Sequence, residues 1–214
     1  MGFNRSAILL GCVLFCGHLA SALPQGEGAV EIRVMLENRV KIPRRMLQHA
    51  EGEAARILGA ARIHVDWIDC AQVATCHHVP GRNEFVLSIV ADGKTSSELV
   101  YGVAFLGPAG EGKYADIFFR RMEAAAMETG ANVPRLLGTV MAHELGHLLL
   151  GSNAHNFEGI MSPVWKTSVL RRMEMGSLLF TQGEAAAMRG KLAGEDGAEQ
   201  LPAYTRARPR NPLP

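Results

Sequence analysis

The residues best placed to do chemistry form the run His143-Glu144-Leu145-Gly146-His147. Two histidines four positions apart lie on one face of an α-helix, where both imidazoles can reach a single metal ion. Glu144 lies about 100° around the helix from His143 and therefore flanks the same ion. A carboxylate in that position can take the proton from a water molecule that zinc activates. The run therefore predicts a zinc site with His143 and His147 as ligands and Glu144 as general base.

A third ligand is needed, because a catalytic zinc ion usually has three protein ligands and one water. His155 is the nearest available histidine after the helix. A carboxylate from the helices that follow is the alternative, and Glu174 and Glu184 are the residues available for it. Beyond His155, a tight turn over residues 159–161 can seat Met161 beneath the metal site.

These residues resemble the metzincin clan of zinc metallopeptidases, whose motif H-E-x-x-H-x-x-G-x-x-H is followed by a turn that contains methionine. The run around the two histidines also looks like a group of uncharacterised exported bacterial metzincin-like proteins. The resemblance implies a peptide or protein substrate, bound in extended form along a sheet edge in residues 99–106 or 114–119. The matching residues are His143, Glu144, His147, Gly151, His155 and Met161.

The chain departs from the clan's pattern at three points. Gly151 comes one residue late, and His155 stands eight residues beyond His147, where the clan has six. Ser162 and Pro163 follow the methionine where some clan members place a tyrosine, so no role of such a tyrosine carries over.

The composition is that of one ordinary globular domain. The chain has 214 residues, of which 48% are hydrophobic and 20% charged, with a formal net charge of +1. Apolar content at this level excludes global disorder, and the balanced charge gives no electrostatic footprint for nucleic acid. We therefore expect no nucleic-acid partner, and we expect a monomer.

Residues 1–22 are typical of a secretory signal peptide. Arg5 gives a positive start, Ala7–Phe15 an apolar core and Ala20–Ala22 a small-residue cleavage site. A lipoprotein signal ending at Cys12 is the alternative, and it leaves a very short apolar core. We therefore expect a secreted or periplasmic protein with no stable membrane insertion after cleavage.

The two cysteines outside this signal, Cys70 and Cys76, are expected to form a disulfide in an exported protein. Closing so short a loop contributes about 2 kcal/mol in the chain-entropy model. Two free thiols are the alternative, and the spacing is wider than the usual two to four residues between zinc ligands. The neighbouring His77 and His78 are expected on the surface.

Alternating and helical patterns predict the elements that position the site, and Pro43, Asn132 and Thr181 give helix-start signals. Gly102, inside the fourth predicted strand, marks a bulge or the close approach of another backbone. The predicted strands cover 30–36, 62–68, 84–90, 99–106 and 114–119, and the predicted helices cover 43–60, 121–129, 134–150, 170–180 and 181–192.

This order predicts an α+β fold, with a metzincin-like mixed twisted sheet of about five strands, an active-site helix and C-terminal helices. The domain is expected over residues 23–200, followed by a disordered tail over 201–214. The predicted function is that of a zinc-dependent metalloendopeptidase, a hydrolase with Glu144 as general base. The alternative is a non-catalytic zinc-containing module that binds peptides.

Overall fold

The computed structural model describes residues 29–71, 76, 78–94 and 100–194. In this part of the chain, five strands form one twisted sheet in the order β2-β1-β3-β5-β4. Neighbouring strands are parallel except for β4, which runs antiparallel to β5. The predicted mixed sheet and α+β class are therefore confirmed. The strands are β1 Val30–Asn38, β2 Ile63–Asp69, β3 Glu84–Val90, β4 Gly102–Phe105 and β5 Tyr114–Phe118.

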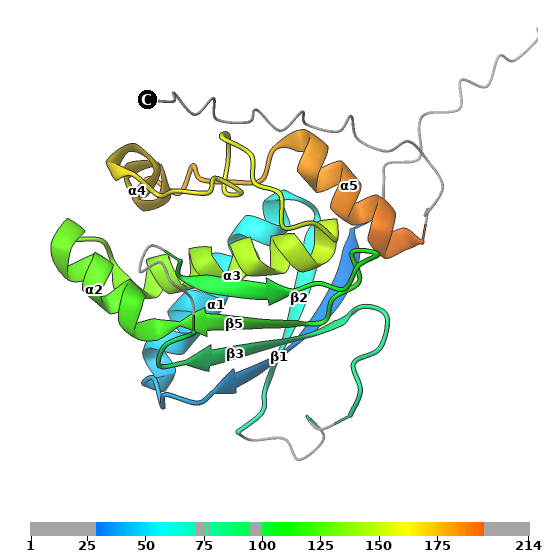
Figure 1. Ribbon diagram of the computed structural model, residues 1–214, viewed down its shortest axis with the longest axis horizontal. Helices are drawn as coiled ribbons and strands as arrows, with labels where there is room; N and C mark the ends of the chain where they lie inside the picture. The colour runs from blue at the N-terminus through cyan, green and yellow to red at the C-terminus, as the bar shows by residue number, and fades with distance from the viewer. Residues whose placement is uncertain (1–28, 72–75, 77, 95–99, 195–214) are drawn as a thin grey trace, which may run out of the picture.

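The helices are α1 Arg44–Ala60, α2 Phe119–Thr129, α3 Val133–Leu150, α4 Thr167–Glu174 and α5 Gln182–Ala193. The long helices α1 and α3 pack against each other, and both contact the sheet. Figure 1 shows α4 and α5 across α3 from the sheet. Helix α3 is therefore enclosed between the sheet and the C-terminal helices.

The ends of α3 follow local signals that its sequence carries. The side chain of Asn132 accepts a hydrogen bond from the N–H of Arg135, and Pro134 lies in the first turn. Gly151 ends the helix in the left-handed conformation, with φ of 65°. Every residue from Leu136 to Leu149 is buried, so this helix needs apolar residues around its whole circumference.

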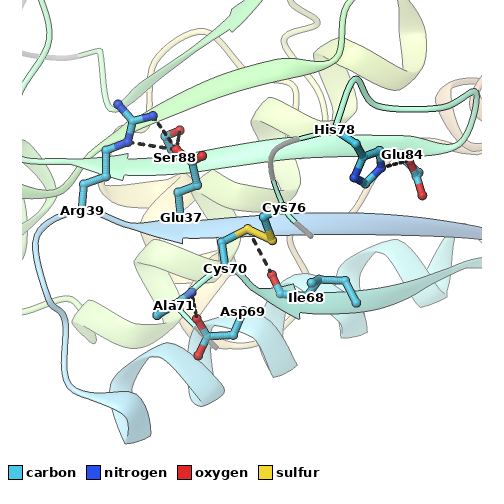
Figure 2. The surroundings of a disulfide bond; sticks show 10 residues. All are labelled: Glu37, Arg39, Ile68, Asp69, Cys70, Ala71, Cys76, His78, Glu84 and Ser88. Atoms are coloured by element: carbon cyan, nitrogen blue, oxygen red, sulfur yellow. Dashed lines mark hydrogen bonds and ion pairs between the residues drawn. A yellow bond between two sulfur atoms is a disulfide. The ribbon is translucent and has the colours of Figure 1, made fainter. Parts of the chain in front are cut away.

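The opposite face of the sheet carries the disulfide between Cys70 and Cys76, as predicted (Figure 2). The alternation of Val30, Ile32, Val34 and Leu36 with Glu31, Arg33 and Met35 predicts a half-buried strand, with Met35 on the open face. Met35, on the other face, is nevertheless 1% exposed, because it packs with Cys76 and Val86 in a small second core. The half-buried pattern was therefore wrong at this position.

The helix predicted over 170–180 is also corrected. Helix α4 runs Thr167–Glu174, and Gly176 then turns the chain with φ of 69°. Residues 178–180 are not helical, and the carbonyl of Leu179 accepts a hydrogen bond of 2.9 Å from the N–H of Ile160. This contact with a distant turn fixes the segment, and no local pattern could show it.

Two smaller differences concern the boundaries of other elements. Helix α2 begins at Phe119, two residues before its predicted start, and β4 is confined to Gly102–Phe105. Of the two sheet edges that the resemblance offered, β4 provides the edge, because β5 lies between β3 and β4.

The predicted signal peptide 1–22 and tail 201–214 lie outside the described residues, as do Leu99 and His77. None of the helices that the structure describes is long and apolar enough to cross a membrane.

Candidate metal centre

His143 and His147 lie one turn apart on α3, and both are buried. Their Nε2 atoms are 3.0 Å apart. Each Nδ1 lies 2.8 Å from a backbone carbonyl oxygen, that of Ile160 for His143 and that of Ser152 for His147. Because a carbonyl oxygen can only accept, each Nδ1 carries the proton and each Nε2 presents a lone pair.

The two facing lone pairs create a place for a cation. Burial, reinforced by the neighbouring His147, lowers the pKa of His143 to about 3, and burial lowers the pKa of His147 to about 4. Both rings are therefore neutral at neutral pH, and no shared proton holds them together. Neutral imidazole nitrogens are ligands that zinc prefers, so the donors fit this metal.

His155 completes a group of three donors. Its ring stacks on His143 at a centroid distance of 5.4 Å and meets His147 edge-on at 4.9 Å. The ligand atoms of the three histidines lie within 4.8 Å of one another, and the described residues contain no other such group. His155 is exposed while its partners are buried, so the group is open to solvent on the side of His155. The predicted metal-binding histidines are thus brought together.

A turn after α3 accommodates the long spacing between His147 and His155. The N–H groups of Gly151 and Ser152 donate to the carbonyl of His147 and close the helix, at 2.9 and 3.2 Å. The chain then reverses, so that the carbonyl of Ser152 accepts from the His147 ring. Further along, the N–H of Asn156 donates to the carbonyl of Met161 at 2.9 Å. The loop that carries His155 is therefore tied on both sides.

Glu144 is 4% exposed, and burial raises the pKa of its carboxyl to about 8. Its side chain lies against Gly102 at the start of β4, where an added Cβ atom would be 2.6 Å from Oε1. A residue other than glycine at position 102 would therefore displace the carboxyl. The sequence predicted a close approach at Gly102, and the approaching group is this carboxyl rather than another backbone.

Met161 lies directly against α3 and is 1% exposed. A Cβ atom added to Gly146 would be 2.8 Å from its sulfur, so the methionine fills the space that glycine leaves. The preceding residue, Ile160, supplies the carbonyl that orients the ring of His143. The turn therefore contacts both α3 and the ring of His143.

A cleft of ≈210 Å³ opens beside the histidines and Glu144. Trp165 forms one wall, with its ring 5.7 Å from His143 and 6.1 Å from Tyr101, and its Nε1 donates to the carbonyl of Ser162. Sequence patterns gave no signal for Trp165 or Tyr101. The rest of the lining is uncharged and mainly apolar: Val100, Tyr101, Gly102, Val103, Ala104, Val140, Asn153, Ser162, Pro163 and Trp165.

The carboxylates considered as alternative third ligands have other partners. Glu174 accepts a hydrogen bond of 2.8 Å from the N–H of Asn132 and pairs with Arg135, at the first turn of α3. Glu184 accepts from the N–H of Thr181 in the capping box of α5. Both carboxylates serve helix starts, and neither belongs to the three-donor group.

Comparisons with known proteins bear on the fold. No protein-family model matches the chain, and no curated protein matches its sequence. A zinc-dependent peptidase from Methanocorpusculum labreanum (strain Z) aligns with TM-score 0.52 and 15% identity, over 73% of this chain and 99% of that chain. An archaemetzincin from Methanopyrus kandleri aligns with TM-score 0.46 and 18% identity, over 80% and 99%. The chain therefore has a fold similar to that of a zinc-dependent peptidase, with a three-histidine group able to bind a metal ion.

Proposed function

We propose that this chain is a zinc-dependent metalloendopeptidase, a hydrolase of peptide bonds. The observation that carries the proposal is the pair of buried, neutral histidines whose Nε2 lone pairs face each other at 3.0 Å. His155 adds the third donor, and Glu144 lies next to them beside an open sheet edge. The similarity of fold to a zinc-dependent peptidase supports this assignment.

His143, His147 and His155 would hold the zinc ion, which supplies Lewis-acid polarisation of a carbonyl and a lowered pKa for water. With zinc bound there, the Glu144 carboxyl would be ionised and able to act as a base, because a nearby positive charge favours the charged form. Glu144 then accepts the proton of the attacking water and delivers it to the leaving amine. Met161 and the turn that contains it support the ligands from below.

In the part of the chain that the structure describes, β4 is an edge strand, and its outer side is suited to an extended peptide. The N–H of Phe118 donates to the carbonyl of Tyr101 at 2.8 Å, so the next pair along the ladder leaves Gly102 unbonded to β5. By the same alternation, the N–H and C=O of Gly102 and Ala104 point to the open edge. A substrate strand can pair there with its backbone next to Glu144. Such pairing needs no free chain end, which favours an endopeptidase.

The cleft wall indicates the substrate side chain. Tyr101, Val140, Pro163 and Trp165 present apolar surface. Apart from the three histidines and Glu144, which are assigned to the metal and the water, the lining contains no residue that is charged at neutral pH. A charged side chain would lose hydration there without a partner. We therefore expect uncharged, apolar side chains next to the cleaved bond.

The proposed location is outside the cytoplasm, secreted or periplasmic. It depends on the signal-like residues 1–22, and the disulfide of Cys70 and Cys76 is consistent with an oxidising compartment. The proposed partner is a peptide or protein substrate, and the chain is expected to act as a monomer.

Replacement of the base tests the proposal. In zinc-loaded Glu144→Gln, hydrolysis of a mixed peptide library should fall by about 100-fold or more, while zinc affinity is retained. Glu158→Gln, an exposed change in the loop after His155, is the control and should leave both unchanged. A wild-type protein that binds zinc and peptides but cleaves none would support the non-catalytic peptide-binding module instead.

A further inference from the structure

Arg121, in the first turn of α2, joins two separate parts of the chain. Its side chain is only 10% exposed. The guanidinium donates to the carboxylate of Asp92, to the carbonyl of Gly93 at 2.9 Å and to the carbonyl of Val100 at 3.2 Å. Asp92 and Gly93 directly follow β3, whereas Val100 lies just before β4. One side chain therefore holds both ends of the connection between these strands.

The surroundings of Arg121 are closely packed. Its guanidinium lies 4.9 Å from the centre of the Phe118 ring. Gly93 lies against the same ring, because an added Cβ atom would be 2.1 Å from its Cζ. A planar guanidinium stacked on an aromatic ring keeps its edge donors available for carbonyl groups. The arginine is thus held in one orientation by the ring and by the acceptors Asp92, Gly93 and Val100.

The position of Arg121 is not explained by the stability of its own helix. Cations near a helix N-terminus interact unfavourably with the helix dipole. The first turn of α2 contains no acidic residue and two arginines, Arg120 and Arg121. Arg120 is exposed, so only Arg121 combines this cost with burial. Its contacts with the β3–β4 connection supply the compensating interactions.

These contacts lead into the cleft. The carbonyl of Val100 is bonded to Arg121, and the carbonyl of Tyr101 accepts from the N–H of Phe118. Gly102, the next residue, lies against the carboxyl of Glu144. Val100, Tyr101 and Gly102 all line the cleft. The side chain of Arg121 itself does not line it, so any effect on substrate passes through these three residues.

We propose that Arg121 is a positioning residue, which fixes Val100–Gly102 so that the substrate-binding edge stands at the correct place relative to Glu144. This inference rests on the proposed peptidase function. Loss of the guanidinium frees the Val100 carbonyl and loosens the first residues of the edge. Because the edge holds substrate in both ground and transition states, the loss is expected in KM more than in kcat.

The matched pair Arg121→Gln and Arg120→Gln tests the proposal. Both changes remove one cation from the first turn of α2, so their effects on the helix dipole are alike. For a fluorogenic peptide selected from an octapeptide library, Arg121→Gln should lower kcat/KM by about tenfold, mainly through KM. Zinc affinity should stay at the wild-type value, and Arg120→Gln should match wild type throughout. Unchanged kcat/KM in folded Arg121→Gln would overturn the proposal, as would a parallel loss of zinc affinity.

Amide hydrogen exchange supplies a readout that does not need activity. The N–H of Phe118, which donates to the Tyr101 carbonyl, should exchange faster in Arg121→Gln and not in Arg120→Gln.

If Arg121→Gln does not fold, the variant Asp92→Asn replaces it in the test. This change removes the charge of one acceptor of Arg121 and should also raise KM, whereas an unchanged KM would count against the proposal. If wild type cleaves nothing while the exchange of the Phe118 N–H still rises in Arg121→Gln, the peptidase assignment fails. Only the structural role of Arg121 in fixing Val100–Gly102 then remains. If wild type is active but the exchange of the Phe118 N–H is unchanged in Arg121→Gln, the positioning role of Arg121 is refuted and the peptidase assignment is not.

Discussion

Two regions of the molecule each combine histidine with glutamate. One is the buried centre, with His143, Glu144 and His147, and the other is the opposite face of the sheet, with His78 and Glu84. The pKa values of the two glutamate carboxyls differ. Burial raises the pKa of Glu144 to about 8. The pKa of Glu84 is lowered to about 2, by a hydrogen bond from the N–H of Gly81 and then by His78 and Arg33. Figure 2 shows the pair of His78 and Glu84, whose nearest atoms are 2.7 Å apart.

Residue type alone therefore does not decide which histidines and glutamates form a candidate metal site. Glu84 already has a full set of donors, and its charge is satisfied within the protein. Within the described residues, burial is the cause that raises the pKa of Glu144, and the histidines beside it present unprotonated nitrogens to one another. The buried histidines therefore have nitrogen lone pairs with which to bind a cation, whereas His78 and Glu84 already pair with each other.

The largest expected difference between the two regions is in metal binding. His143→Ala removes one of three donors, and zinc affinity should fall by more than about 100-fold. The expected loss is this large because losing only a residue that hydrogen-bonds to a metal ligand already costs about 10–100-fold. His78→Ala should leave zinc affinity unchanged. Titration with a competing chelator measures both. Equal affinities for the two variants would contradict a metal site at the buried centre.

A second prediction concerns the contact between the sheet edge and the base. In Gly102→Ala, the new methyl group meets the Glu144 carboxyl and should displace it, so kcat should fall by about 100-fold with zinc affinity retained. Gly52→Ala is the control, because a Cβ atom there has open space at an exposed position of α1. That control should keep full activity and gain about 0.5–1 kcal/mol of stability. Full activity in Gly102→Ala would show that Glu144 is not held in its reactive position by this contact.

Removal of the disulfide tests whether the protein can be destabilised on the outer face of the sheet without a change in zinc affinity at the three histidines. Replacement of Cys70 and Cys76 by serine should lower the free energy of unfolding by about 2 kcal/mol, because a short loop in the unfolded chain is no longer closed. Zinc affinity should not change. Urea unfolding and chelator competition measure the two quantities. A loss of zinc affinity would mean that the two faces of the sheet are coupled.

The smallest expected effect is the pH dependence of Glu84. Because its folded pKa is below its ordinary value of 4.5, its contribution is fully present above that pH and is lost as pH falls toward about 2. Glu84→Gln should therefore lose stability relative to wild type at pH 7, and the difference should shrink between about pH 4.5 and pH 2. Urea midpoints over this range provide the measurement. A difference that grows on acidification would reverse the assigned sign.

Local sequence signals predicted the elements that carry the metal group. Asn132 and Gly151 mark the ends of α3, and His143 and His147 share a helical face because of their spacing alone. The disulfide also followed from counting cysteines. The helix predicted over 170–180 failed because Gly176 and the contact of Leu179 with Ile160 override its apolar pattern. Met35 was misplaced for a similar reason, since its cover comes from a loop distant in sequence.

The sequence by itself determined the type and spacing of the donors, since one helical turn links His143, Glu144 and His147 covalently and geometrically. Only the tertiary structure decided the state of those groups. Carbonyls of Ile160 and Ser152 select the protonated nitrogen of each ring, and burial sets the pKa of each group. Hydrogen bonds and desolvation of this kind depend on which distant residues meet, and a linear pattern does not encode that directly.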